Sequence, residues 1–378
     1  MALSIKPYIE NKERIHLIGI GGVSMNSLAE LLLSKGVPVS GSDRLRTDVT
    51  ARLEALGASI TYEHRPENVE GASLIVRTAA VHDENLEIVR AHELGIPVME
   101  RAEAWGHIMR DYDNVVCLSG THGKTTSTSM MTMMTIEAQM DPTVMVGSNL
   151  PAIGGTLRIG GKGCFVAESC EYTNSFLRFA PTVSVILNVE EDHLDFFKDI
   201  NDIIHSFHEF AELTPMNGLV VVNHDDPNAM RAVAHIDRRI RTFGTTSDAD
   251  VYPTEVRDEN GYYRFTVNID GKEYAKVALS VPGRHNMLNA LACCAAAEFL
   301  GVPGEAAEKG LNKFTGSSRR FQLVGKMPNG ATVVDDYAHH PSEMKATLNT
   351  AKEMHFDRIL CAFQPHTYTR TKALFHEF

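Results

Sequence analysis

The chain has 378 residues, 43% of them hydrophobic, and a formal net charge of -12. This length exceeds one ordinary hydrophobic core, so two or three domains are expected. The negative charge, with no long Lys/Arg cluster to offset it, argues against a protein held to nucleic acid by phosphate neutralisation. An anionic small-molecule substrate remains compatible, because it needs only a local positive pocket.

The sequence contains no apolar run near the roughly 18 residues that a membrane span requires, and the N-terminal segment MALSIKPYIENKER is too polar for a signal-peptide core. Its six cysteines are scattered without metal-ligand or disulfide spacing. We therefore expect a cytoplasmic protein with reduced thiols and no membrane span.

Residues 14–110 alternate between strand-like and helix-like patterns. The segment begins with IHLIGIGG, continues with a helical pattern and VPVSGSD, and later contains the apolar runs ASLIVRTAAV and GIPVME. This alternation is typical of a parallel-sheet α/β unit. We predict a Rossmann-like domain over residues 1–112.

A second run of strands starts at NVVCLSG and continues with CFVAES, VSVILNV and GLVVVN. Residues 249–283 differ, because alternating Tyr, Phe and Val positions and turn pairs such as Asp270-Gly271 predict a small antiparallel insertion. We assign residues 113–317 to this central P-loop domain. Residues 318–378 open a third α/β unit with RRFQLVGK and two further strands, ATVVDDYA and RILCAFQ, and are too short to complete a doubly wound sheet.

The stretch CLSGTHGKTTSTSMM joins an apolar strand to a helical pattern through small residues. It departs from the strict G-x-x-x-x-G-K-[ST] motif, because Leu118 stands where the first glycine would be. A strand, a loop with inward amides, a lysine, two hydroxyls and a helix N-terminus are nevertheless the physical parts of a phosphate cradle. Lys124 would reach the β- and γ-phosphates and Thr125 would ligate Mg²⁺. The alternative is a tight turn with a solvated lysine.

The loop GIGGVSM at residues 19–25 is a weaker phosphate signal. Gly19 and Gly21 match the dinucleotide fingerprint, but Ser24 replaces its third glycine. Asp43 follows at the end of the next strand, where an acidic residue would hold a ribose hydroxyl. The loop is predicted to receive a nucleotide diphosphate, with an ordinary glycine turn as the alternative.

Polar side chains also follow the predicted strands of the central and third domains. Glu168 ends FVAE, and Glu190, Asp192 and His193 follow the next strand, so Glu168 and His193 are candidate Mg²⁺ ligands. His285 and Asn289 lie one helical turn apart in PGRHNMLNALA and could frame a planar base. The third unit adds a predicted site wall, whose members are Asp336, His339, His340, His366 and Arg370.

The order of GTHGKTT, the E-x-D-H element at residues 190–193, PGRHNMLNA and DDYAHHP resembles the Mur ligase family of peptidoglycan synthesis over essentially the whole chain. The start HLIGIGGVSMNSLAE and the GSD triplet are most similar to the members that add L-alanine to UDP-N-acetylmuramate. The resemblance implies an ATP-dependent ligase. ATP would phosphorylate the lactyl carboxylate of the sugar nucleotide, and the alanine amine would attack the acyl phosphate to form an amide.

The resemblance also implies roles for individual residues. The expected triphosphate ligands are Gly120, Thr121, His122, Gly123, Lys124, Thr125 and Thr126. Glu168 and His193 would join Thr125 at magnesium. Adenosine and phosphate would contact His285, Asn289, Arg320 and Asp336, and the amino acid or transferred group would face His339 and Arg370. The UDP pocket would contain Gly19, Ile20, Gly21, Gly22 and Asp43. His193 and His339 are both able to accept the amine proton.

Two departures from the family pattern bear on this assignment. Many alanine-adding relatives have arginine where Thr367 stands, and the family's third domain is a full α/β unit of which only the beginning is expected here. A ligase that recycles a tripeptide onto the same sugar nucleotide shares GTHGKTT and is an alternative function for this chain. Two further alternatives are a nicotinamide-dependent oxidoreductase, suggested by GIGG and Asp43, and a nucleotide-binding protein without ligase activity. A monomer or weak homodimer is expected.

Overall fold

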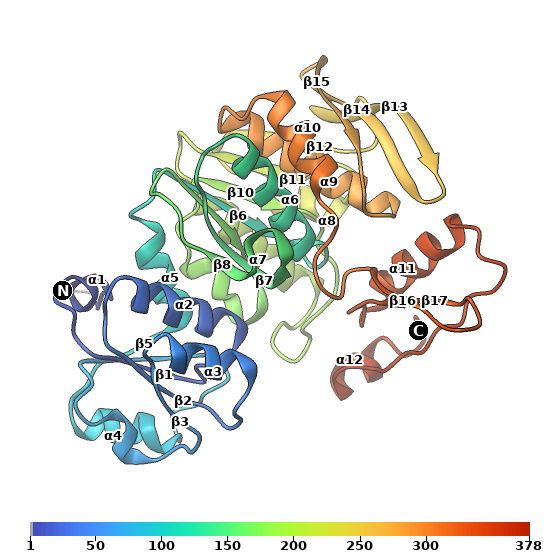
Figure 1. Cartoon of the computed structure of the whole chain (residues 1–378). Helices are drawn as coiled ribbons and strands as arrows, with labels where there is room; N and C mark the ends of the chain where they lie inside the picture. Colours follow the sequence, from blue (N-terminus) through green and yellow to red (C-terminus); the bar gives the residue numbers. More distant parts are fainter. Residues whose placement is uncertain (1–2) are drawn as a thin grey trace.

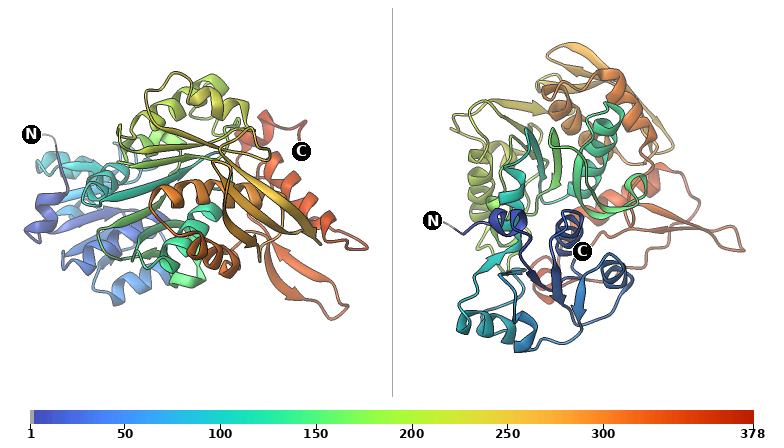
Figure 2. Two further views of the ribbon diagram at one scale, coloured as in Figure 1. Left: turned by 90° about the horizontal axis from the view of Figure 1, so that it is seen from above. Right: turned by 60° about the vertical axis from the view of Figure 1, so that its left-hand side comes forward.

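The computed structural model describes residues 3–378 and confirms an α/β protein built from three successive units (Figure 1). The first unit and the antiparallel insertion lie at opposite ends of the central unit, and the third unit lies beside the central unit (Figures 1 and 2). Within the described residues, every helix is too short or too polar to span a lipid bilayer.

The first unit contains a five-stranded parallel sheet in the order β3-β2-β1-β4-β5. Central β1 is buried at every position, as expected for a strand covered on both faces. The strands are β1 (Ile15–Ile18), β2 (Val39–Ser42), β3 (Ser59–Thr61), β4 (Leu74–Arg77) and β5 (Val98–Glu100). The helices are α1 (Lys6–Glu10), α2 (Val23–Ser34), α3 (Asp48–Ala55), η1 (Pro66–Val69), α4 (Leu86–Glu93) and α5 (Arg101–Met109).

The central unit contains a ten-stranded mixed sheet in the order β15-β14-β13-β12-β11-β10-β6-β9-β7-β8. Its middle strands, β10, β6 and β9, are parallel. The strands that precede the antiparallel insertion in the chain are β6 (Asn114–Ser119), β7 (Thr143–Leu150), β8 (Gly155–Arg158), β9 (Cys164–Glu168), β10 (Val183–Ile186), β11 (Leu219–Asn223) and β12 (Ile240–Phe243). The helices are α6 (Lys124–Glu137), η2 (Pro151–Ile153), η3 (Tyr172–Arg178), α7 (Ile200–Glu212), α8 (Pro227–Ala232), α9 (Arg284–Phe299) and α10 (Gly304–Lys313).

The predicted antiparallel insertion is confirmed as β13 (Val251–Glu259), β14 (Tyr262–Ile269) and β15 (Lys272–Ala278). It extends the central sheet beyond β12 through the pair Phe243 and Val251. The first hairpin turns at Asn260 and Gly261, whose φ angles are 55° and 83°. Positive φ at both positions matches the right-handed twist of a two-residue hairpin.

Aromatic packing joins the first unit to the central sheet. Trp105 on α5 packs edge-on against Phe165 of β9, with ring centroids 5.9 Å apart, and its indole N–H donates to the Ser24 carbonyl at 3.3 Å. Tyr112 also packs edge-on against Phe165, with ring centroids 4.9 Å apart. Because Ser24 lies in the first turn of α2, this contact fixes the neighbouring glycine loop relative to the central unit.

The third unit has two antiparallel strands, β16 (Gln322–Lys326) and β17 (Thr332–Asp335), and two helices, α11 (Pro341–Glu353) and α12 (Tyr368–Ala373). The prediction of a strand at residues 358–364 was wrong, because this segment has no regular secondary structure and is exposed. A strand needs a neighbour to accept its backbone hydrogen bonds, and within the described residues no strand lies beside this segment.

Glu87 is fully buried in the first unit, where four side chains share its carboxylate. Oε1 lies 3.3 Å from His16 Nε2 and 2.7 Å from Asn68 Nδ2. Oε2 lies 2.7 Å from His64 Nδ1 and 2.8 Å from Ser42 Oγ. Burial by itself would raise the pKa of Glu87, but these hydrogen bonds outweigh burial and lower the pKa to about 2.

This network predicts acid-sensitive stability. Because the folded pKa of Glu87 lies below its ordinary value of 4.5, the carboxylate stabilises the fold above about pH 4.5, and that stabilisation is lost as the pH falls toward about 2. We expect Glu87→Gln to lower the free energy of unfolding at pH 7 by about 3 kcal/mol and to flatten its pH dependence in this window. Urea unfolding of E87Q, with exposed Glu84→Gln as control, measures both effects. An unchanged slope in E87Q would contradict the assignment.

Candidate active site

The phosphate loop connects β6 to α6 in the predicted strand-loop-helix order. Gly120 and Gly123 have φ angles of 142° and 83°, in the region that favours glycine. Asn188, two residues beyond the end of the neighbouring strand β10, holds the loop. Its carbonyl accepts from the Thr121 amide at 3.1 Å, and its side-chain oxygen accepts from the His122 amide at 2.7 Å. The loop therefore has a fixed shape at the N-terminus of α6, where the helix dipole favours anions.

Gly123 should be intolerant of a side chain for two reasons. Its φ is left-handed, and an added Cβ would lie 2.7 Å from Asn289 Oδ1. We expect Gly123→Ala to weaken ATP binding by about tenfold or more, because the strain alone costs about 1–2 kcal/mol. Calorimetric titration with ATP measures this loss. Gly163→Ala is the matched control, since a Cβ there meets open space, and equal affinities of the two variants would argue against a shaped phosphate loop.

Lys124 opens α6 and forms an ion pair with the buried carboxylate of Glu171. Its Nζ lies 3.0 Å from Glu171 Oε2 and donates to the Thr121 carbonyl at 3.0 Å. Burial would lower the pKa of Lys124, but the Glu171 carboxylate outweighs it and raises that pKa above its usual value. The lysine is thus a fixed positive charge at the mouth of the loop.

The expected magnesium ligands are brought together only in part. Thr125 Oγ1 donates to Glu168 Oε1 at 3.1 Å, and Glu168 Oε2 accepts from the Gly147 amide at 2.7 Å. A Cβ on Gly147 would lie 2.4 Å from Glu168 Oε1, so the backbone forms a cradle for this carboxylate. Hydroxyl and carboxylate oxygens are the donors that Mg²⁺ prefers, and the Thr125 and Glu168 pair fits that ion.

His193 points to a neighbouring part of the site. Its Nε2 lies 3.9 Å from Glu171 and 3.8 Å from Asp192, and its ring stacks on Tyr172 at 4.5 Å. The residue has a φ of 53°, in the left-handed region that is uncommon for residues other than glycine. Its assignment as a magnesium ligand stays a prediction, as does its assignment as a base.

A cavity of about 240 Å³ lies between the phosphate loop, α9 and the third unit. The predicted ATP residues that line it come from segments far apart in the sequence: His122, Gly123, Thr126, His285, Asn289, Arg320 and Asp336. His285 and Asn289 project from the first turns of α9, and burial lowers the pKa of His285 to about 4. A neutral imidazole and a side-chain amide are suited to contact an uncharged nucleobase.

The third unit closes this cavity with polar groups. Arg320 Nη2 donates to Thr125 Oγ1 at 3.3 Å. Asp336 accepts the Phe321 and Ala338 amides at 2.8 and 2.7 Å, and burial raises the pKa of this carboxyl. His339 belongs to the same unit but does not line the cavity, and its Nδ1 lies 2.8 Å from the Tyr337 carbonyl, which favours the tautomer with a free Nε2.

Arg370 occupies a buried position different from the predicted contact with substrate. Its Nε and Nη2 both donate to Asp192 Oδ1, at 2.9 and 2.7 Å, and both side chains are less than 10% exposed. Burial would raise the pKa of Asp192, but the charges of His193 and Arg370 lower it. This pair joins α12 to the loop after β10. Contact between Arg370 and an amino acid stays a prediction.

The candidate UDP loop is held by the strand beside it. The amides of Gly19 and Ile20 donate to the Ser42 carbonyl at 2.8 and 3.1 Å, and the Gly21 amide donates to Asp43 Oδ2 at 2.8 Å. Gly22 caps α2. Asp43 therefore shapes the glycine loop, and its contact with a ribose stays a prediction.

Three residues that the sequence did not single out complete the site: Asn188, Glu171 and Glu343. Glu171 neutralises Lys124, and Glu343 on α11 lies 3.2 Å from His122 Nδ1. Glu171 had a local signal, since it lies three residues beyond Glu168 at a strand end. Glu343 had no local signal pointing to His122, 221 residues away.

Comparison with known proteins agrees with this geometry. Residues 14–113 match the Mur ligase family catalytic domain, residues 118–297 the Mur ligase middle domain, and residues 319–378 the Mur ligase glutamate ligase domain. The UDP-N-acetylmuramate–L-alanine ligase of Clostridium novyi is 47% identical over 369 residues, covering 98% of this chain and 80% of that protein. The chain belongs to the Mur ligase family. The enzyme of the same name from Acetivibrio thermocellus is 48% identical, over 97% of this chain and 78% of its own length.

Solved Mur ligase structures share the fold. The Thermotoga maritima UDP-N-acetylmuramate-alanine ligase superposes with a TM-score of 0.82 at 32% identity, covering 96% of this chain and 83% of that chain. A Neisseria UDP-N-acetylmuramate:L-alanyl-γ-D-glutamyl-meso-diaminopimelate ligase gives a TM-score of 0.75 at 27% identity, covering 81% of this chain and 99% of that chain. The expected membership of the Mur ligase family is confirmed.

Proposed function

We propose that the chain joins L-alanine to the lactyl carboxylate of UDP-N-acetylmuramate, with ATP as the energy source, in peptidoglycan precursor synthesis. The observation that carries this proposal is the convergence of distant predicted ATP residues on one cavity beside the phosphate loop. Relatives named for this reaction are 44–48% identical over nearly the whole chain. The cytoplasmic location and the monomeric or weakly dimeric state expected from the sequence stay predictions.

The reaction requires two anions, a carboxylate and a triphosphate, to approach each other. Lys124 and the amides of α6 supply positive charge where the γ-phosphate would lie, and Arg320 supplies a second cation from the third unit. Held in this way, the carboxylate oxygen attacks the γ-phosphorus and ADP leaves, which converts a poor acyl donor into an acyl phosphate. His285 and Asn289 would orient the base.

Thr125 and Glu168 would hold Mg²⁺, supported by their oxygen donors and by the Gly147 cradle. When bound, Mg²⁺ neutralises phosphate charge during transfer. Glu171 is not assigned to Mg²⁺, because its carboxylate already balances the positive charge of Lys124.

Amide formation then requires the alanine amine to lose a proton. His339 is suited to accept it, because burial lowers the pKa of its imidazole and the Tyr337 carbonyl leaves Nε2 unprotonated. The amine attacks the acyl carbon, the tetrahedral intermediate expels phosphate, and the amide forms. His193 is the alternative acceptor.

Two alternatives are less well supported. Tripeptide-ligating relatives are 25–27% identical where the Thermotoga alanine ligase is 32% identical, so L-alanine is favoured over a tripeptide. A nicotinamide oxidoreductase would need Asp43 for a ribose, yet that carboxylate accepts the Gly21 amide, and the phosphate loop would remain unused.

The test is phosphate release from ATP by this chain with Mg²⁺ and UDP-N-acetylmuramate, comparing L-alanine, glycine, L-serine and L-alanyl-γ-D-glutamyl-meso-diaminopimelate. We expect release and an amide product that depend on L-alanine. Release with the tripeptide alone would support the recycling ligase. Binding of both nucleotides without amide formation would contradict the proposal.

A further inference from the structure

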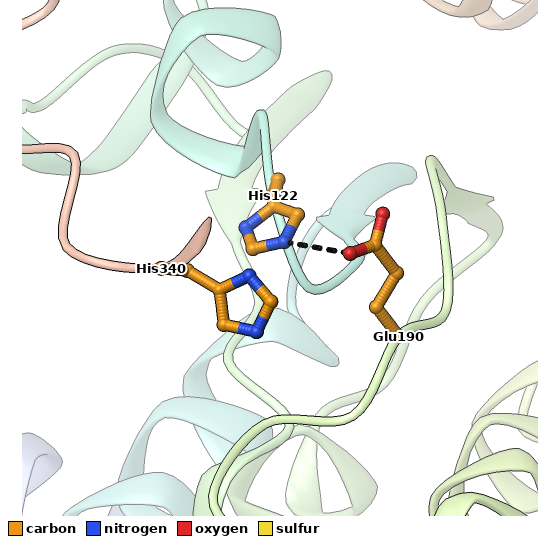
Figure 3. Close-up of side chains that lie close together, drawn as sticks. All are labelled: His122, Glu190 and His340. Carbon is orange, nitrogen blue, oxygen red and sulfur yellow. Dashed lines mark ion pairs between the residues drawn. The ribbon is translucent and has the colours of Figure 1, made fainter. Parts of the chain in front are cut away.

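A second group of metal-ligating side chains lies between the phosphate loop and the third unit. His122 lies in the phosphate loop, Glu190 lies in the segment after β10, and His340 is the N-cap residue of α11. One ligand atom of each residue lies within 4.8 Å of the others, and Figure 3 shows the three side chains converging. This group shares no residue with the Thr125 and Glu168 pair.

The outer nitrogen of each histidine already has an acceptor. His122 Nδ1 lies 3.2 Å from the Glu343 carboxylate, and His340 Nε2 lies 3.0 Å from the Glu191 carbonyl. Metal-binding histidines in proteins almost always donate their second N–H to a carboxylate or a backbone carbonyl, which fixes the tautomer and orients the ring. The same arrangement here leaves His122 Nε2 and His340 Nδ1 as the lone-pair atoms.

Those two inner nitrogens have little competition for their lone pairs. His122 Nε2 is buried and makes no hydrogen bond among residues 3–378, and it faces the Glu190 carboxylate at 3.4 Å. His340 Nδ1 accepts only the amide of Ser342, at a long 3.3 Å.

The distance to the carboxylate also suits a small tetrahedral ion. Two bonds of about 2.0–2.1 Å that meet at a tetrahedral angle separate their ligand atoms by about 3.4 Å. His122 Nε2 and Glu190 Oε2 are 3.4 Å apart. Two imidazoles and one carboxylate, with a fourth position open, form a donor set typical of Zn²⁺, whereas Mg²⁺ prefers oxygen ligands.

We infer that His122, Glu190 and His340 bind a divalent transition-metal ion of the Zn²⁺ class, at a site separate from the magnesium ligands. The His122 ring lies between two carboxylates, with Nε2 3.4 Å from Glu190 and Nδ1 3.2 Å from Glu343. An ion bound at Nε2 would balance the negative charge of these carboxylates, and Ser342, which hydrogen-bonds Glu190, lies beside it.

An ion at the proposed metal site would connect the third unit to the central unit. Its ligands belong to the phosphate loop, the β10 loop and the start of α11, so an ion fastens the third unit to the phosphate loop. His122 and Glu190 also line the 240 Å³ cavity. An ion at this position would hinder exchange of nucleotide, and Zn²⁺ should therefore inhibit turnover even in excess Mg²⁺.

The test is titration of the full chain with Co²⁺ in a large excess of Mg²⁺, followed by visible absorption. Tetrahedral Co²⁺ absorbs much more strongly than octahedral Co²⁺, so this readout needs no ligase activity. We expect one equivalent of the tetrahedral spectrum, displaced by Zn²⁺. Glu343→Gln, which keeps all three ligands, should weaken Co²⁺ binding by about 10- to 100-fold.

His340→Asn is the decisive variant, because asparagine still caps α11 but offers only an amide oxygen at the ligand position. It should lose the spectrum and the thermal stabilisation by Zn²⁺, whereas exposed His355→Asn should keep both. Circular dichroism of H340N checks its fold, and Glu190→Gln provides a second ligand variant. An octahedral spectrum, an absent spectrum, or equal spectra in wild type and H340N would overturn the inference.

Discussion

Replacing Lys124 by methionine is expected to reduce alanine-dependent phosphate release by about 10²–10³-fold or more, while the affinity for UDP-N-acetylmuramate stays unchanged. The lysine lies at the N-terminus of α6, where its Nζ pairs with Glu171 and would also reach a phosphate bound in the loop. The sugar nucleotide is expected at the Gly19–Gly22 loop of a different sheet. Steady-state phosphate release and calorimetric titration with the sugar nucleotide measure the two quantities.

The same substitution leaves the buried Glu171 carboxylate without its partner, and the resulting instability could imitate a catalytic defect. The double variant Lys124→Met/Glu171→Gln removes both charges and should restore thermal stability without restoring turnover. Exposed Lys162→Met is the control for a general loss of charge. If K124M/E171Q recovered wild-type turnover, Lys124 would have only a structural role.

Local sequence patterns predicted the parts of the fold whose determinants lie close together in the chain. The alternation of strand-like and helix-like patterns in the first unit indicated a parallel-sheet α/β fold, and turn pairs such as Asp270-Gly271 indicated the antiparallel insertion. The phosphate loop was predictable because its strand, glycines and helix are contiguous. Each of these features depends on the chemistry of a few neighbouring residues.

The contacts between units could not be predicted in that way. His122 meets Glu343, and Asp192 meets Arg370 across 178 positions, and no periodicity links such distant residues. Glu171, which pairs with Lys124, lies just before a sharp bend at Thr173 and Asn174, whose φ angles are 54° and 57°. Asparagine is enriched in left-handed conformations, but these are unusual for threonine, so the sequence carried no clear signal for a bend across both residues.

The segment at residues 358–364 shows a second limit of prediction from the sequence. Its composition favours a strand, but a strand also needs a partner strand, and the prediction treated local propensity as sufficient.

The site assignments likewise depend on both residue type and three-dimensional arrangement. The sequence indicated which residue types could bind phosphate or metal, and only the three-dimensional arrangement shows that Thr125 and Glu168 are adjacent while His193 faces Glu171 and Asp192.

The Arg370 and Asp192 pair leads to the second prediction. Arg370→Met should release α12 from the loop after β10, because removing one partner of a buried ion pair leaves the other charge uncompensated, at a cost of about 3–5 kcal/mol. We expect faster hydrogen exchange in α12 and in residues 190–193, with the core strands of the central sheet unchanged. Exposed Arg358→Met in the same unit is the control.

A comparison with Asp192→Asn separates two roles for Arg370. If Arg370 acts by docking the third unit, R370M and D192N should lower kcat to similar extents, and the double variant should be no worse than either single variant. If Arg370 instead binds the amino acid, R370M should raise the KM for L-alanine strongly, D192N should not, and the two effects should add. Because Asp192 lies beside His193, a docking role would also mean that α12 helps to hold the His193 imidazole against Glu171, so that closure of the third unit and assembly of the reaction centre depend on one ion pair.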